Sequence, residues 1–283
     1  MRKKMGKISL AAIGLGLLTL GASSARADLL LKALSTGDDT LFQNNANNSL
    51  GDPVFFSGMD SNNSPKIGLM AFNISAIPSY ATITSATLDL WIGMVAGSGG
   101  GNVTNFGPLR TISVYDESQA WGASANETGS TAFAGHGQGF GANNGDATWD
   151  AAAYNLSNPS QSTAWTSGSA ANITGSSTPL ATTSGIPGTD GAEVQWTSTA
   201  LATEVQGWVD TPSSDNGLAI VNSTVSNSQT FLAFWSASGS ANNGNGLAPN
   251  LVVTYTVPEP VSLSLVAMVA PILLCRRQRR ALS

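Results

Sequence analysis

Residues 83–92 hold the clearest alternation of apolar and polar side chains in this sequence. Ala86, Leu88, Leu90 and Ile92 recur at every second position, and the side chains at 85, 87 and 89 are polar. Successive side chains of a β-strand point to opposite faces of its sheet. The period of two therefore predicts a half-buried strand.

Six further short segments have the composition of strands and are separated by turns rich in Gly, Asn, Ser or Pro. The segment 66–74 is apolar on both faces, as expected of a central strand, and Ile77-Pro78-Ser79 separates it from the alternating strand. The other five segments are 110–115, 192–196, 216–222, 230–235 and 250–257. Short strands joined by such turns predict an all-β fold, an antiparallel β-sandwich.

One segment has a helical period instead. Leu201, Val205 and Trp208 follow one another at i, i+4 and i+7, which predicts a short helix. Ser198 or Thr199 is available to cap its start, and Thr211-Pro212 ends it. We expect this helix to close one end of the sandwich.

Residues 116–185 show no regular period. They carry Trp121, Trp149 and Trp165 among Ser, Gly and Asn. This composition predicts long loops with a few short strands, and loops of this length are often functional.

The N-terminus has the order of a secretory signal peptide. Arg2, Lys3, Lys4 and Lys7 precede an apolar stretch at 8–21. The small residues Ala25 and Ala27 then form an A-x-A cleavage pattern, which predicts a signal peptide over 1–27. The alternative is a buried N-terminal helix, which the charges at the start and the cleavage pattern disfavour.

The C-terminus carries a second apolar stretch at 261–275. As a helix it would reach about 22 Å, short of the hydrocarbon core of about 30 Å. A cluster of four arginines follows it, Arg276, Arg277, Arg279 and Arg280. Since cationic flanks stay on the cytoplasmic side, both ends of the chain place its middle outside the inner membrane.

The same tail begins with Pro258-Glu259-Pro260. The motif, the apolar helix and the arginine cluster together resemble the PEP-CTERM sorting tail of Gram-negative bacteria. The resemblance implies that an exosortase-type membrane protease cuts near Pro258, Glu259 and Pro260, after a transient membrane association of the 257–283 segment. It also implies an exported cell-surface or extracellular-matrix protein in an exopolysaccharide producer. The alternative is a plain single-pass tail anchor.

The body between the two ends, 28–256, is strongly acidic. It holds sixteen acidic residues against Lys32, Lys66 and Arg110. Nucleic-acid binding is excluded as a function class, because neutralising phosphates requires Lys and Arg. The single cysteine, Cys275, lies in the tail, so we expect no disulfide in the body.

The order of motifs in the body is similar to a known domain family. The segments 37–58 and 69–92 are followed by Trp-bearing stretches at 117–124 and 147–154 and by the segments 201–209, 216–221, 231–238 and 248–255. Together they resemble a DNRLRE-type domain, akin to the family 96 carbohydrate-binding modules. The resemblance implies a jelly-roll-like β-sandwich on a secreted protein, with carbohydrate binding known for some members. Asn73 departs from the family, which usually has Asp there.

The sequence offers little for catalysis. His136 is the only histidine and lies in a glycine-rich loop, which is typical of a solvated loop residue. Asp38-Asp39, Asp116-Glu117 and Asp146/Asp150 are the candidate carboxylate pairs for glycoside hydrolysis, which needs two carboxyls about 5 to 10 Å apart across a cleft. We predict that the protein is not an enzyme and has no resident cofactor.

Two Asp- and Asn-rich loops favour a structural calcium ion, because calcium prefers oxygen ligands in flexible loops. They are "SGMDSNNS" at 57–64 and "GANNGDATWD" at 141–150. Neither loop has EF-hand spacing, and no individual ligand is assigned.

Glycan binding needs exposed aromatic rings and polar groups on a rigid frame. Trp165, Trp149 and Tyr154 are the predicted ligand-binding residues, with Trp165 expected to be the most exposed because polar residues surround it. Core packing is the alternative for every tryptophan and the expected state of Trp121, Trp196, Trp208 and Trp235. The sequence thus predicts a non-enzymatic matrix or surface protein that binds polysaccharide, with a purely structural matrix role and a glycan-active hydrolase as alternatives.

Overall fold

A computed structural model describes residues 24–60, 62–95, 108–122, 138–166, 173–174, 176–224, 229–239 and 246–258. Within it, Arg26–Val257 form one compact unit. Strands make up 49% of the structure and helices 13%, so the predicted mostly β fold is confirmed.

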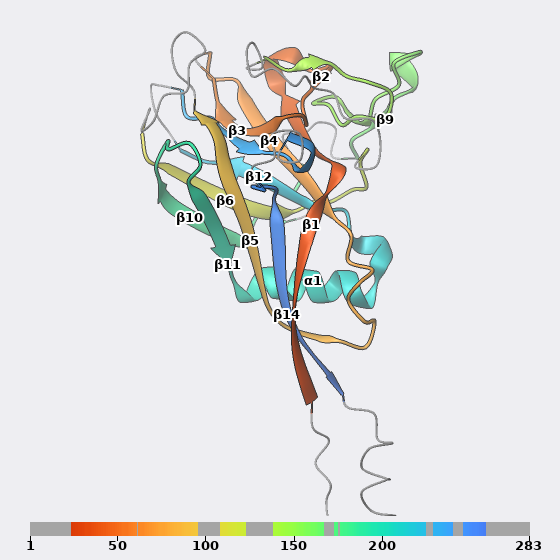
Figure 1. The fold of residues 1–283 in the computed structure, drawn as a ribbon. Helices are drawn as coiled ribbons and strands as arrows, with labels where there is room; N and C mark the ends of the chain where they lie inside the picture. The colour runs from red at the N-terminus through yellow and green to blue at the C-terminus, as the bar shows by residue number, and fades with distance from the viewer. Residues whose placement is uncertain are drawn as a thin grey trace, which may run out of the picture. The chain divides into compact units, whose positions relative to one another are not determined.

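The structure contains all seven predicted strands and several more (Figure 1). The strands are β1 (Ser24–Phe42), β2 (Asn48–Ser49), β3 (Val54–Met59), β4 (Pro65–Phe72), β5 (Thr82–Val95), β6 (Arg110–Asp116), β7 (Phe140–Gly141), β8 (Ala151–Ala153), β9 (Thr163–Ala164), β10 (Ala181–Ile186), β11 (Glu193–Thr197), β12 (Leu218–Asn222), β13 (Leu232–Trp235) and β14 (Asn250–Pro258). Short 3-10 turns lie at Gln43–Asn45, Pro159–Gln161 and Pro212–Ser214.

Most of the strands belong to one antiparallel system. Its order is β1-β14-β5-β13-β3-β4-β12-β6-β10, and β11 pairs with β5. Because β1 also pairs with β4, the path from β1 to β4 closes on itself. Register shifts in β1 between Ala33 and Asp38 and in the β13–β5 pairing mark irregularities where strands bend. The result is a β-sandwich-like fold.

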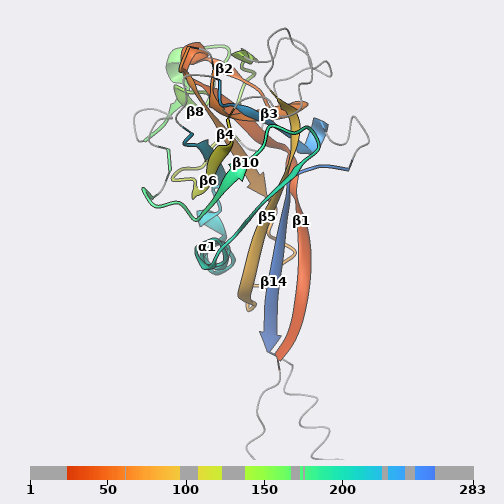
Figure 2. The same cartoon turned by 90° about the vertical axis from the view of Figure 1, so that its left-hand side faces the viewer.

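The helix α1 (Thr199–Asp210) lies across β5 and is seen nearly end-on in Figure 2. The Ser198 hydroxyl accepts a hydrogen bond from the Leu201 backbone N–H at 2.9 Å, so the predicted cap is confirmed. Leu201, Val205 and Trp208 face inward and join the main core between the strands, as their spacing predicts.

The described parts of the 116–185 region, namely 116–122, 138–166, 173–174 and 176–185, contain few strands. A second hydrophobic cluster contains Trp121, Trp149 and Trp165 together with Leu41 and Leu69. The β8–β9 pair belongs to this region. These described parts therefore have a core of their own, and the strands that they contain, β7 to β10, are short.

Candidate functional site

A cleft of about 810 Å³ opens between the β4–β5 connection and the end of α1. One wall is the loop from Asn73 to Tyr80, and the other holds Val209, Pro212 and Asp215. Leu34 and Phe72 also line it. Concave sites of this size, mainly apolar with a few converging polar groups, are the usual ligand sites of proteins.

The first wall is a pair of consecutive turns. Ile77 N–H donates to the Ile74 carbonyl and Ala81 N–H donates to the Pro78 carbonyl, both at 2.9 Å. The Asn73 side-chain oxygen accepts from Ser75 N–H at 3.0 Å, which fixes the start of the loop. Ile77 is buried in the core, whereas Tyr80 is 66% exposed. The loop is therefore anchored from below and presents one aromatic ring at the rim.

The second wall follows from the way α1 ends. Thr211 N–H donates to the Gly207 carbonyl, and the Ser214 hydroxyl donates to the Thr211 carbonyl at 2.8 Å. Gly217 then takes a φ of +84°, which glycine adopts without strain, and its N–H donates to Asp215 Oδ1 at 3.3 Å. These contacts hold the Asp215 carboxyl in the wall.

Asp215 is electrostatically unusual. Burial raises its pKa from 3.8 to about 6; the Gly217 N–H opposes the rise, and the charge of Glu204 adds to it. The carboxyl changes its charge near neutral pH and can accept hydrogen bonds from a bound ligand. Among the described residues that line the cleft, it is the only acidic one.

The cleft lining combines apolar and polar groups. An exposed ring, the Asn73 amide, the hydroxyls of Ser75 and Ser79 and one carboxyl suit a ligand that has both an apolar face and hydroxyl groups. Hydrolysis of a glycosidic bond requires a second carboxyl facing the first. None of the predicted carboxylate pairs lies in the cleft lining.

Those pairs lie elsewhere in the fold. Asp38 and Asp39 are buried in β1, and Asp146 and Glu117 are also buried. Asp150 is exposed.

The predicted ligand-binding aromatics lie outside the cleft. Trp165 is 3% exposed, and its Nε1 donates to the Thr148 carbonyl at 2.8 Å. Trp149 is buried in the same cluster, and Tyr154 is half-buried. The expectation that Trp165 is exposed was therefore wrong: polar neighbours in sequence point outward while the indole packs inward against the sheet.

The sequence patterns did not predict a site at the residues that line the cleft. The turn at 77–79 was predicted, and Tyr80 follows it directly. An aromatic residue next to a turn is often exposed, and this signal could have identified Tyr80. Asp215 could not have been found, because only the fold brings it opposite the 73–80 loop.

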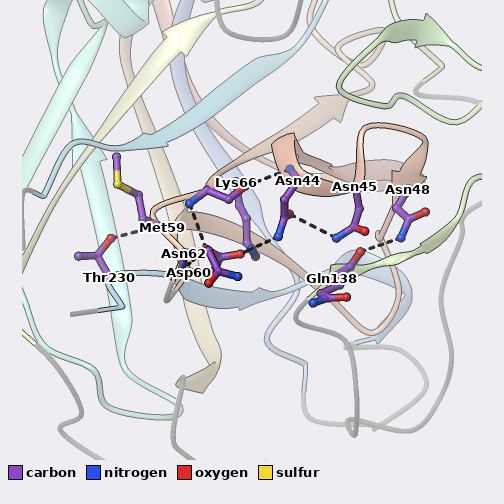
Figure 3. Close-up of polar contacts among 10 residues, drawn as sticks. Asn44, Asn45, Asn48, Met59, Asp60, Asn62, Lys66, Gln138 and Thr230 are labelled. Atoms are coloured by element: carbon purple, nitrogen blue, oxygen red, sulfur yellow. Dashed lines mark hydrogen bonds and ion pairs between the residues drawn. The ribbon is translucent and has the colours of Figure 1, made fainter. Parts of the chain in front are cut away.

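The first predicted calcium loop is held together by the protein's own donors (Figure 3). Asp60 Oδ1 accepts from the N–H groups of Asn62 and Ser64 at 2.8 and 3.0 Å. Asp60 Oδ2 accepts from Asn44 Nδ2 at 3.0 Å and from Lys66 Nζ at 3.2 Å. Four donors thus occupy this carboxylate.

The second loop is tied to β1. Asp39 accepts from the Ser49 hydroxyl at 2.6 Å and from Ala147 N–H at 3.0 Å, and Asp146 accepts from Asn143 N–H at 2.7 Å. Burial and the charge of Asp146 raise the pKa of Asp39 well above its usual value. In the part of the chain that the structure describes, no group of three or more His, Cys, Asp and Glu side chains is arranged to hold a metal.

The sorting residues fall largely outside the described residues. Ala25 and Ala27 lie at the start of β1, and Pro258 ends β14. Outside the described ranges are Glu259, Pro260, Arg276, Arg277, Arg279, Arg280, His136 and the stretches 8–21 and 261–275. Among the described residues there is no helix long and apolar enough to cross a membrane.

Comparison with known proteins adds no further assignment. No family model matches the chain, and no relative is found among curated proteins.

Proposed function

We propose that this chain is an exported, non-enzymatic protein of the cell surface or extracellular matrix that binds neutral polysaccharide in the Tyr80 cleft. The observation that carries the proposal is the 66% exposed ring of Tyr80 at the rim of a cleft whose walls supply Asn73 and Asp215. A sugar ring has an apolar face of C–H groups and an edge of hydroxyls. The first suits an aromatic ring, and the second suits amide and carboxyl groups.

The two ends of the sequence support the export part of the proposal. A charged and then apolar N-terminus with Ala25 and Ala27 suits removal of residues 1–27. The 257–283 tail, with its Pro-Glu-Pro motif and arginine cluster, suits sorting by an exosortase-type protease. Mass analysis of protein recovered from the matrix is expected to show Asp28 as its first residue and to end near Pro258.

The family part of the proposal is a DNRLRE-like domain with jelly-roll connections. It is supported by the antiparallel, sandwich-like arrangement and by the capped helix α1 between β11 and β12, where the resemblance places it.

The non-enzymatic part rests on the composition of the cleft. Asp215 is the single acidic residue in the lining, and acid–base hydrolysis of glycosides uses two. Release of reducing sugar from any polysaccharide that the protein binds would contradict it.

The binding test is a pull-down on insoluble cellulose, chitin and starch with the purified protein. Tyr80→Ala is expected to weaken retention about tenfold, because the loss of one stacking contact of about 1.4 kcal/mol is a factor of ten in affinity. Tyr80→Phe keeps the ring and should retain most of the binding.

The matched control is Leu109→Ala, which removes an equally exposed apolar side chain, also 66% exposed, that does not line the cleft. Equal losses for Tyr80→Ala and Leu109→Ala would overturn the assignment of the cleft. If the unmodified protein is retained on none of the polysaccharides, the structural matrix role is the one that survives.

A further inference from the structure

A guanidinium group lies in the core-facing row of strand β6. Arg110, Ile112 and Val114 occupy alternate positions and are all fully buried. Ile112 and Val114 belong to the main core, so Arg110 continues the same inward face to the start of the strand. Its exposed fraction is 0%.

Among the described residues, this guanidinium makes one hydrogen bond. Arg110 Nε donates to the Thr230 carbonyl at 3.1 Å, and Asn222 Nδ2 donates to the same oxygen at 2.9 Å. The two terminal nitrogens of Arg110 are buried and have no hydrogen-bond partner. Burial lowers the pKa of Arg110, and no acidic residue opposes that shift.

Lys66 shows how the same fold treats its other buried cation. Lys66 Nζ contacts Asp60 Oδ2 at 3.2 Å and lies 5.4 and 5.7 Å from the ring centres of Phe42 and Phe231. It therefore has both a counter-charge and aromatic faces. Arg110 has neither among the contacts of the described residues.

A buried charge without a partner is costly, and arginine does not escape the cost by losing its proton. A guanidinium also presents two parallel N–H groups that match an anion in a bidentate arrangement. The two free nitrogens of Arg110 have this geometry. Full burial excludes a polymer as the partner and leaves a small species: an ordered water would satisfy the two nitrogens but not the charge, whereas a small anion would satisfy both.

We propose that Arg110 binds a small monovalent anion, chloride or a short carboxylate, enclosed at the end of the core beside Thr230 and Asn222. The anion completes the hydrogen bonding of the two terminal nitrogens and neutralises the guanidinium. This site is separate from the Tyr80 cleft, whose lining does not include Arg110. Its role is to stabilise the junction between β6 and the segment that enters β13.

The test compares sodium chloride, sodium formate and sodium gluconate at one ionic strength, with the purified protein and the unfolding temperature as the readout. Chloride and formate are expected to raise the melting temperature relative to gluconate, by about 5 °C at a hundredfold excess over the dissociation constant. Equal melting temperatures in all three salts would overturn the proposal. A rise with formate alone would identify the carboxylate as the ligand, and a rise with chloride alone would identify the halide.

Arg110→Met should abolish the difference between the salts. The substitution removes an unpaired buried charge and keeps the apolar stem, so the variant is expected to fold. Lys66→Met is the matched control: it removes the other buried cation and should keep the response to chloride. The same response in Arg110→Met as in the unmodified protein would show a general salt effect and overturn the site.

A second measurement does not depend on stability. The chloride-35 resonance should broaden in the presence of the protein, and added formate should reverse the broadening by competition. Loss of the broadening in Arg110→Lys, which keeps the charge but not the planar fork, would support bidentate binding. Broadening of the same size in Arg110→Met as in the unmodified protein would show weak surface association and count against the enclosed site.

Discussion

Lys66 Nζ donates a hydrogen bond to Asp60 Oδ2 across 3.2 Å, from a side chain that is fully buried (Figure 3). Burial lowers the pKa of Lys66, and the neighbouring Asp60 charge opposes that shift. The pair joins the end of β3 to the start of β4, and Asn44 extends it to the turn that follows β1. The ion pair and the Asn44 hydrogen bond therefore connect three segments of the chain through Asp60.

Removing only one partner of this pair should be much worse than removing both. Asp60→Asn leaves a buried ammonium without its counter-charge and is expected to cost about 3 kcal/mol or more of unfolding free energy. The double variant Asp60→Asn, Lys66→Met should recover a large part of that loss. Urea unfolding of the two single variants and the double variant measures the coupling, and additive losses would contradict it.

The stability of the protein should fall as the pH rises from about 4 to 8. Burial raises the pKa of Asp38 to about 8 against the opposing Ala237 N–H. Burial also raises the pKa of Glu117 to about 8, with the charge of Asp116 adding to it. At a pH between the unfolded and folded pKa values, the folded chain binds more protons than the unfolded chain. The stabilisation from these two carboxyls is therefore present at about pH 4 and is lost as the pH rises towards 8.

Urea midpoints between pH 4.5 and 8 test this dependence. Asp38→Asn keeps the side-chain shape without the ionisation and should make the decline shallower. Asp150→Asn, at an exposed position, is the control and should leave the slope unchanged. A midpoint that stays constant with pH would show that these carboxyls ionise as freely in the folded as in the unfolded chain, and would contradict the prediction.

Trp165 is a stability residue and should not affect glycan binding. Trp165→Ala empties a buried site in the second hydrophobic cluster and removes the shorter of two hydrogen bonds to the Thr148 carbonyl, which keeps the Ala151 N–H at 3.4 Å. The expected loss is about 3–5 kcal/mol of unfolding free energy. Thermal melting combined with the polysaccharide pull-down separates the two roles, because Tyr80→Ala should show the reverse pattern. Weaker binding by Trp165→Ala at a temperature where it is fully folded would contradict this assignment.

Alternating apolar positions were enough to predict the strands that face the main core. Leu88, Leu90 and Ile92 lie on the core-facing side of β5, and Leu201, Val205 and Trp208 form the buried face of α1. In each case a single period in the sequence matches a single buried face. Local patterning decides the structure where one side of an element is apolar and the other is not.

The strand β1 could not be predicted in the same way. Asp38, Asp39 and Thr40 are consecutive polar residues and are nevertheless buried within it. Their side chains accept hydrogen bonds from donors outside the strand: Ala237 N–H donates to Asp38 Oδ2, Ala147 N–H to Asp39, and Phe56 N–H to Thr40. Burial of polar groups depends on these distant donors, and no local pattern encodes them.

The burial of basic side chains predicts which polysaccharides the protein accepts. Residues 28–256 contain three basic residues against sixteen acidic ones, and the fold buries two of the three, Lys66 and Arg110. Lys32 is exposed. Five acidic residues are buried as well, namely Asp38, Asp39, Asp89, Glu117 and Asp146. The surface therefore stays strongly acidic, with Lys32 as the exposed basic residue of this range in the part of the chain that the structure describes.

Neutral polysaccharides should bind without a metal ion, and anionic polysaccharides should bind only when calcium is present. A negatively charged polymer is repelled by the acidic surface, and Arg110 cannot attract it because the guanidinium is enclosed. Salt screens interactions beyond about 8 Å at physiological ionic strength, so added sodium chloride removes only the long-range part of the repulsion. Calcium can bridge a surface carboxylate and a uronate directly, since its coordination shell takes six to eight oxygens.

Pull-downs on cellulose and on calcium-free and calcium-loaded alginate, each repeated with a chelator, test this prediction. Retention on alginate in the presence of chelator would contradict the charge argument, because a surface with so few exposed cations would then be holding a polyanion without an intermediary.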